Sequence, residues 1–113
     1  MKLLLAFMMM GSMLSADSKF SLGSDTLKPE LTKAEEYQGF GRNGENRSPE
    51  LHWSNAPKGT KSFAVTVFDP DAPTDHGWWH WILVNIPASV THLPQNASAA
   101  KALPEGAVET KND

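Results

Sequence analysis

The sequence predicts a mainly β protein built on an antiparallel sheet, with only a few short helices. Residues 62–68 and 78–86 carry this prediction, because both are rich in β-branched and aromatic side chains and both end at a proline or a turn. Glycine, proline and asparagine interrupt the rest of the chain, and no stretch shows the apolar period of a long helix. With 113 residues, the chain has room for one domain.

The start of the chain differs in composition from the rest. A positive charge at Lys2, an unbroken apolar run over residues 3–10 and the small pair Ser15-Ala16 match a secretory signal peptide. A membrane anchor is the alternative, but the apolar run is well short of the roughly 20 residues that cross a bilayer. We therefore expect residues 1–16 to be a signal peptide, no stable membrane span, and residues 17–113 to form one periplasmic or secreted domain.

Residues 17–47 are polar and rich in turn residues, so they predict little regular structure. Phe20-Ser21-Leu22 fits a first edge strand. The pair Glu35-Glu36 is placed to open a short helix, which Gly39 and Gly41 would end at once. The main sheet is therefore expected in the second half of the chain.

A short strand and the strongest strand of the chain follow. Leu51-His-Trp53 is bounded by Pro49 and by turn residues at 55–59. Residues 62–68 are apolar on both faces by the two-residue period of a strand, so a central position in the sheet is expected. Two of the next five residues are prolines, and they end the strand because proline lacks the N–H of a sheet ladder.

Residues 78–86 form the second strong strand, which Pro87 closes. Strict alternation places His80 on the same face as Ile82 and Val84, which is an apolar face. After Pro87 the density of apolar residues falls, and no further strong strand is predicted.

The residues that carry chemistry gather between the two strong strands. Asp69 and Asp71 follow the first strand, and Trp78 and His80 open the second, so strand pairing would bring them to one end of the sheet. A histidine among aromatic side chains is typical of a small-ligand pocket, and a protonated imidazole suits phosphate. A carboxylate of Asp69 or Asp71 would then orient the histidine. The alternative is that the aspartates only accept N–H bonds in a proline-rich turn and that the aromatic residues only pack.

Composition and spacing disfavour several other functions. The chain has no cysteine, and its 10 Lys and Arg residues are scattered against 13 Asp and Glu, so thiolate chemistry is excluded and no nucleic-acid surface is indicated. A metal site at the two aspartates with His76 and His80 is disfavoured, because histidines four apart share a face on a helix and not on a strand. No nucleophile-elbow sequence is present. We therefore expect no metal, no cofactor and no enzymatic activity.

Three motifs together are particular enough to name a family. Asp69-Pro-Asp-Ala-Pro-Thr74, Trp78-Trp-His-Trp-Ile-Leu-Val-Asn85 and Ile86-Pro87 resemble the signature of the phosphatidylethanolamine-binding protein family, in particular its bacterial Raf-kinase-inhibitor-like branch. Residues 44–53 and 56–65 resemble the pattern before this signature, and Leu103-Pro-Glu-Gly-Ala-Val108 with Asn112-Asp113 resembles the segment after it. The resemblance implies a large antiparallel sheet with a smaller sheet and peripheral helices. It also implies an anion pocket lined by Asp69, Asp71, Trp78 and His80, with His80 contacting phosphate and Asp71 orienting it.

The resemblance also implies a function. It favours non-enzymatic binding of a small anionic ligand such as phosphate or a phospholipid head group. An exported inhibitor that acts on a kinase or a protease by protein contacts is the first alternative, and a hydrolase is the last. Members of the family continue beyond Asn112-Asp113 with further strands and pocket residues, so residues 17–113 are expected to be a truncated, partial domain. The oligomeric state is left open, with a dimer among the options.

Overall fold

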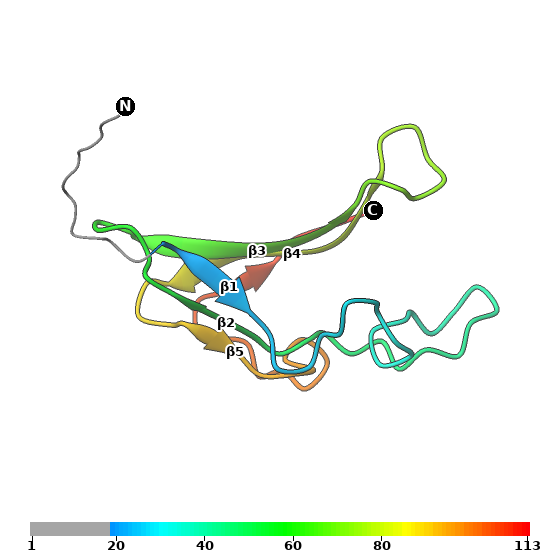
Figure 1. The fold of residues 1–113 in the computed structure, drawn as a ribbon, viewed down its shortest axis with the longest axis horizontal. Helices are drawn as coiled ribbons and strands as arrows, with labels where there is room; N and C mark the ends of the chain where they lie inside the picture. Colours follow the sequence, from blue (N-terminus) through cyan, green and yellow to red (C-terminus); the bar gives the residue numbers. More distant parts are fainter. Residues whose placement is uncertain (1–18) are drawn as a thin grey trace, which may run out of the picture.

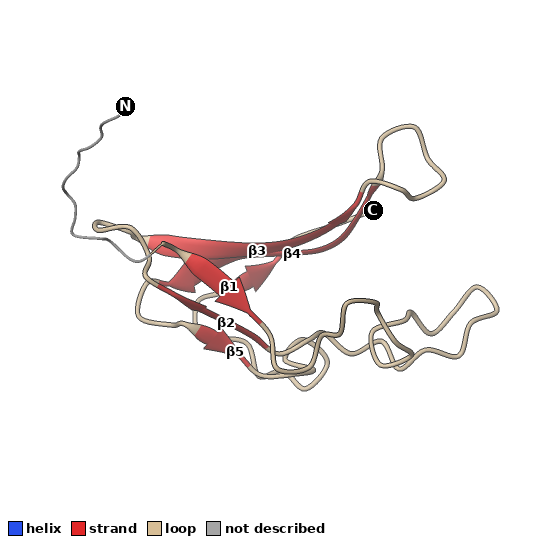
Figure 2. Ribbon diagram, in the orientation of Figure 1, coloured by secondary structure: helices blue, strands red, loops and turns tan. Residues whose placement is uncertain are grey.

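A computed structural model describes residues 19–113, and Figure 1 shows them as two small sheets joined by long loops. The six strands are β1 (Ser21–Gly23), β2 (Leu51–Ser54), β3 (Ser62–Asp69), β4 (Trp78–Pro87), β5 (His92–Leu93) and β6 (Val108–Glu109). Every strand pair is antiparallel, and the described residues contain no helix (Figure 2). The prediction of a mainly β, antiparallel fold is confirmed. The signal peptide expected at residues 1–16 lies outside the described residues.

The larger sheet is a long hairpin with one short strand added. Its strand order is β3-β4-β6, and the hairpin register runs from Ser62 opposite Pro87 to Asp69 opposite Trp78. β4 is therefore the central strand of this sheet, and β3 lies at its edge. In the described sheet, residues 62–68 do not take the central position that was expected. Apolar residues on both faces indicate that both faces of a strand are covered, but they do not indicate its place in the strand order.

The smaller sheet has the order β1-β2-β5. Leu22 lies opposite Trp53 across β1 and β2, and Leu51 lies opposite Leu93 across β2 and β5. The two strands predicted from residues 20–22 and 51–53 are both present. Residues 33–35 form a turn where a short helix was expected.

The core lies where the two sheets pack against each other. Its buried members come from both sheets: Leu51 and Trp53 of β2, Leu83 and Ile86 of β4, and Leu93 of β5. Three of these, Leu83, Ile86 and Leu93, are fully buried. Burying a side chain of this size stabilises the fold by about 1.5–3 kcal/mol. No helix in the described part of the chain is long and apolar enough to cross a membrane.

Two β-bulges in β4 shape the larger sheet. Val67 pairs with Trp81 and Phe68 with Trp79, so His80 is an extra residue with no cross-strand partner. A second register shift follows Leu83, and there Asn85 has a positive φ of 61°. The strict alternation predicted for residues 78–86 is therefore wrong: Leu83 and Ile86, predicted on opposite faces, are both in the core. A bulge inserts a residue into one strand, and this changes the face on which the next side chains lie.

Candidate functional site

The predicted site residues lie together at the end of the β3/β4 hairpin. Asp69 ends β3 and is the register partner of Trp78, which begins β4. The loop that joins them contains Asp71, whose backbone N–H donates a hydrogen bond of 2.9 Å to Asp69 Oδ1. His80 Nε2 lies 3.7 Å from the other carboxylate oxygen of Asp69. The hairpin therefore brings all four residues to one place.

The loop between the strands holds its shape through a buried glycine. Gly77 has a positive φ of 75°, and a Cβ at this position would lie 2.6 Å from the Phe68 ring and 2.8 Å from the Asp69 carbonyl oxygen. The hydroxyl of Thr74 donates a hydrogen bond of 2.6 Å to the carbonyl of Gly77. Only glycine adopts this backbone and leaves this space at no steric cost. The close approach sets the position of Asp69 relative to Trp78.

The carboxylate beside His80 belongs to Asp69 and not to Asp71, the partner that the family resemblance implied. The spacing of 3.7 Å is longer than a hydrogen bond but within the range of an ion pair with a protonated imidazole. Asp69 also accepts the Asp71 N–H, as the turn alternative predicts. One carboxylate thus closes the turn with Oδ1 and lies near the histidine with Oδ2. The turn role is present, and the role in orienting His80 stays a prediction.

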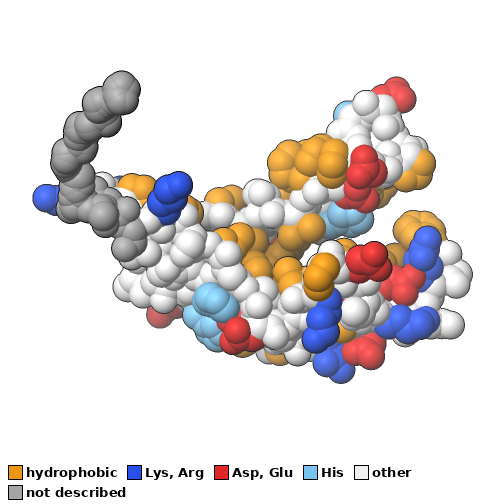
Figure 3. Space-filling model, viewed as in Figure 1, with side chains coloured by type: hydrophobic (Ala, Val, Ile, Leu, Met, Phe, Trp, Pro, Cys, Tyr) orange, Lys and Arg blue, Asp and Glu red, His pale blue; other side chains and the backbone are white. Residues whose placement is uncertain are grey.

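Aromatic side chains surround this end of the hairpin and remain partly exposed to solvent. Phe68 and Trp79 pack with their ring centroids 4.5 Å apart, and Trp78 is 36% exposed. The side chain of His80 is 52% exposed. In the space-filling view, hydrophobic side chains gather in a hollow between this end of the hairpin and the loops that precede β2 (Figure 3). The arrangement offers an imidazole and indole surfaces to a ligand from solvent.

The end of the described chain forms hydrogen bonds with the same part of β4. The backbone N–H of Trp79 donates 2.8 Å to the Asp113 carboxylate, and the Asp113 N–H donates 3.2 Å to the Trp79 carbonyl. The side-chain amide of Asn112 donates to the carbonyl of His80. Sequence reasoning gave these residues no role, although they fall in the segment that resembles the family. They hold the backbone on both sides of the bulge.

A second polar cluster, which sequence reasoning missed, lies on the outer face of the smaller sheet. Glu50 is buried there and accepts from His52 Nδ1 at 2.9 Å, and His92 Nε2 lies 3.2 Å from the same oxygen. A hydrogen bond from the Asp25 backbone N–H, followed by the one with His52, lowers the pKa of Glu50. The hydrogen bond to Glu50 raises the pKa of His52. The signal in the sequence is alternation: Leu51 and Trp53 face the core, so their neighbours face outward.

Comparison with known proteins places the chain in a family. Residues 18–113 match the family model described as phosphatidylethanolamine-binding protein. The UPF0098 protein YbcL of Escherichia coli K12 is 54% identical over 98 residues, which are 83% of this chain and 54% of the relative. YbhB of the same organism is 51% identical over 78 residues, 68% of this chain and 49% of the relative. The chain thus spans about half the length of these curated relatives.

Solved structures agree with this result. The crystal structure of E. coli YbcL, described as a new member of the mammalian PEBP family, superimposes with a TM-score of 0.81 at 53% identity. That match covers 85% of this chain and 61% of the crystallised one. A phosphatidylethanolamine-binding protein homologue from Chlamydia trachomatis gives a TM-score of 0.66 at 28% identity, with 82% and 57% covered. The chain therefore belongs to the phosphatidylethanolamine-binding protein family, as its sequence motifs indicate.

Proposed function

We propose that this protein binds a small anionic ligand, a phosphate or a phospholipid-like head group, at the end of the β3/β4 hairpin and without catalysis. The observation that carries the proposal is the placement of His80, which stands in a bulge, half-exposed, beside the Asp69 carboxylate. Bulges next to binding sites commonly redirect one side chain. The family to which the chain belongs supports ligand binding in general.

The chemistry of the site favours a ligand that carries both a negative and a positive charge. A protonated His80 would donate a hydrogen bond to a phosphate oxygen, and the Asp69 carboxylate would orient its ring. The exposed carboxylate of Asp71 would repel a bare anion, whereas an ammonium group next to the phosphate would be attracted to it. The Trp78 surface would cover the apolar part of such a head group. A zwitterion such as phosphoethanolamine therefore suits these residues better than phosphate alone.

The described site residues include no activated nucleophile, which supports binding without turnover. The only hydroxyl in the hairpin loop, that of Thr74, donates its proton to the carbonyl of Gly77. An activated nucleophile instead gives its proton to a base. The proposed setting is the periplasm or the extracellular space, because the chain begins with the charge and apolar pattern of an export signal.

Inhibition of another protein is the second candidate. Phe68, Trp78 and Trp79 are each more than a third exposed and lie at one end of the hairpin. Aromatic residues gathered on a surface are typical of protein contacts. A kinase or a protease is the class of partner that the family resemblance suggests. In this case the aromatic surface, and not the imidazole, would carry the function.

Ligand-dependent heat unfolding of the full chain tests the first proposal. At roughly one hundred times its Kd, phosphoethanolamine should stabilise the fold by about 2.7 kcal/mol and raise the Tm accordingly. The His80→Gln variant should lose this shift, and His76→Gln, in the exposed loop, should keep it. A Tm shift of equal size in both variants would contradict a role for His80. Capture of a partner that survives His80→Gln but fails with Trp78→Ala would favour the second candidate.

A further inference from the structure

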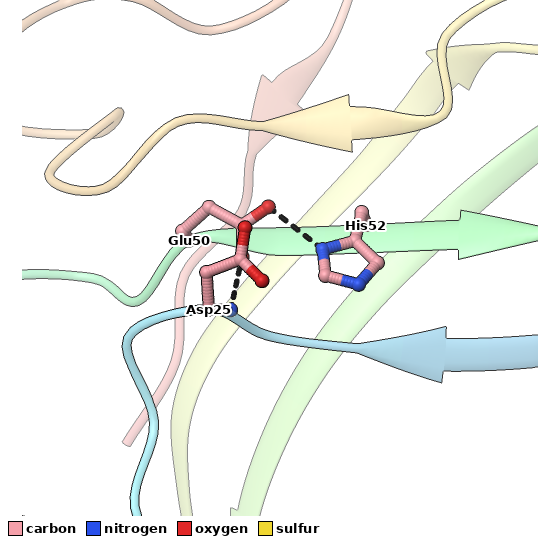
Figure 4. A group of neighbouring side chains, drawn as sticks. All are labelled: Asp25, Glu50 and His52. Atoms are coloured by element: carbon pink, nitrogen blue, oxygen red, sulfur yellow. Dashed lines mark hydrogen bonds and ion pairs between the residues drawn. The ribbon is translucent and has the colours of Figure 1, made fainter.

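The outer face of the smaller sheet carries the second cluster of ionisable side chains. His52 lies opposite His92 in the β2/β5 register and opposite Gly23 in the β1/β2 register. Figure 4 shows Glu50, His52 and Asp25 directed toward one another, with Asp25 placed by the loop that follows β1. Three separate segments therefore bring two imidazoles and two carboxylates together. This cluster belongs to the opposite sheet from the hairpin site.

The distances within the cluster are short. One oxygen of Glu50, Oε2, lies 2.9 Å from His52 Nδ1 and 3.2 Å from His92 Nε2. One ligand atom from each of Asp25, Glu50 and His52 falls within 4.8 Å of the other two. The ring of His52 packs over Gly23, where an added Cβ would lie 2.6 Å from Nε2. The strand pairing therefore covers one ring nitrogen and directs the other, Nδ1, at the carboxylate.

Glu50 is held firmly in this position. Its side chain is only 11% exposed, and its second oxygen accepts the backbone N–H of Asp25 at 2.6 Å. Its own backbone N–H donates 3.0 Å to the hydroxyl of Thr26, and its carbonyl accepts from the hydroxyl of Ser24. Hydrogen bonds of this kind around a ligating carboxylate fix its orientation in metal sites. The cluster is preorganised around one carboxylate.

We propose that Glu50, His52 and Asp25, with His92 beside them, bind one zinc ion or a similar divalent transition cation. Imidazole nitrogen and carboxylate oxygen are the ligands that zinc takes in a protein without cysteine, at about 2.0–2.2 Å. Tetrahedral bonds of that length place neighbouring ligand atoms about 3.3 Å apart, close to the two spacings around Glu50 Oε2. Two carboxylates and neutral imidazoles also balance a charge of +2. Calcium and magnesium are disfavoured because they take oxygen ligands.

The cation would take the place of the proton that now lies between His52 and Glu50. The spacing of 2.9 Å between His52 Nδ1 and Glu50 Oε2 would then widen toward about 3.3 Å. The cation would also join β1, β2 and β5. Asp25 lies in the loop after β1, Glu50 and His52 lie just before and within β2, and His92 lies in β5. The competing explanation is a tether without a cation, in which Glu50 only fastens the loop after β1 to the sheet.

Calorimetric titration of the full chain with Zn²⁺ alone tests the proposal. We expect one bound ion per chain, with affinity weakened by about tenfold or more in both His52→Gln and His92→Gln. Circular dichroism will check that the variants fold. His92→Gln is expected to fold even if His52→Gln does not, because the side chain of His92 is 54% exposed at the sheet edge and contributes little to the core. His76→Gln, in the loop of the other sheet, should bind zinc as the parent does.

Four results would overturn the proposal. The first is no zinc binding at micromolar concentrations in the folded parent, which leaves the cluster a tether. The second is unchanged affinity in both cluster variants. The third is loss of zinc binding in His80→Gln while His52→Gln retains it, which moves the cation to the hairpin site. The fourth is tighter binding of Ca²⁺ or Mg²⁺ than of Zn²⁺, which contradicts the choice of cation.

Discussion

Asp69 Oδ2 lies 3.7 Å from Nε2 of His80, the one residue of the β3/β4 hairpin end that has no partner on the opposite strand. This proximity depends on the bulge at His80. Without the extra residue, regular pairing would shift the register by one residue and turn the imidazole to the other face of the sheet. Asp71, two residues further along the chain, points its backbone N–H at the same carboxylate. Asp69 is therefore the residue that connects the turn to the histidine.

The first prediction separates the two aspartates. Asp69→Ala should weaken phosphoethanolamine binding by about tenfold, roughly 1.4 kcal/mol, because it removes both the acceptor of the turn and the group that orients His80. Asp71→Ala should have a smaller effect, since it removes only an exposed carboxylate that attracts the ammonium group and keeps the backbone N–H that closes the turn. Calorimetry on the two variants measures the difference. Equal losses would mean that Asp69 has no special part in the site.

The second prediction concerns the buried glycine of the hairpin loop. Gly77→Ala should destabilise the fold by about 2–4 kcal/mol, because it adds a Cβ against Phe68 and the Asp69 carbonyl at a positive φ. Gly59→Ala is the matched control: its φ is also positive, at 89°, but no atom lies within 4 Å of the added Cβ. It should cost only about 1–2 kcal/mol. Urea unfolding measures both, and equal costs would exclude the steric contact as the cause.

The third prediction tests the contact between the two sheets. Leu83→Ala should destabilise the protein by about 2–5 kcal/mol, because the side chain is fully buried in the cluster shared by both sheets. Val108→Ala, on the neighbouring strand β6 and 52% exposed, should change stability by about 0.5 kcal/mol or less. Chemical denaturation of the two variants measures both losses. The comparison requires that the unfolding free energy falls with denaturant concentration at the same slope in each variant. A small loss for Leu83→Ala would mean that the sheets do not share a packed core.

The fourth prediction is a stability optimum in acid, set by Glu50 and His52. The pKa of Glu50 is lowered from its ordinary 4.5 by the Asp25 N–H first and by His52 second, so its contribution is present above pH 4.5 and is lost below that value. The pKa of His52 is raised from its ordinary 6.5 by its bond to Glu50, so its contribution is present below pH 6.5 and is lost as pH rises through the folded-state value. Both contributions are complete between pH 4.5 and 6.5.

Heat unfolding in the presence of a chelator, across this pH range, checks the fourth prediction. The parent should lose stability on both sides of the window. His52→Gln should lose the decline on the alkaline side, because glutamine does not titrate. His76→Gln should keep the parent profile. An unchanged alkaline decline in His52→Gln would show that another group causes it.

Much of the fold followed from residue types and their spacing. β-Branched and aromatic runs bounded by proline predicted β3 and β4, and the motif from Asp69 to Thr74 with the tryptophan-rich strand indicated the family. These features are local: each depends on a few neighbouring residues, and the chain carries them wherever it folds. The same local signals predict that Asp69, Asp71, Trp78 and His80 lie at one end of a hairpin.

Tertiary structure decided what depends on register and on contacts between distant segments. The bulge at His80 comes from pairing with β3, and a period of two residues does not contain it. The cluster around Glu50 unites residues forty or more positions apart, such as His52 and Asp25 with His92, which only strand order brings together. The sequence by itself therefore determined the strands β1 to β4, the family, and which residues lie together at the end of the hairpin. The pairing of strands decided which aspartate lies beside His80 and brought the second polar cluster together, because one shifted residue changes the face of every side chain that follows it.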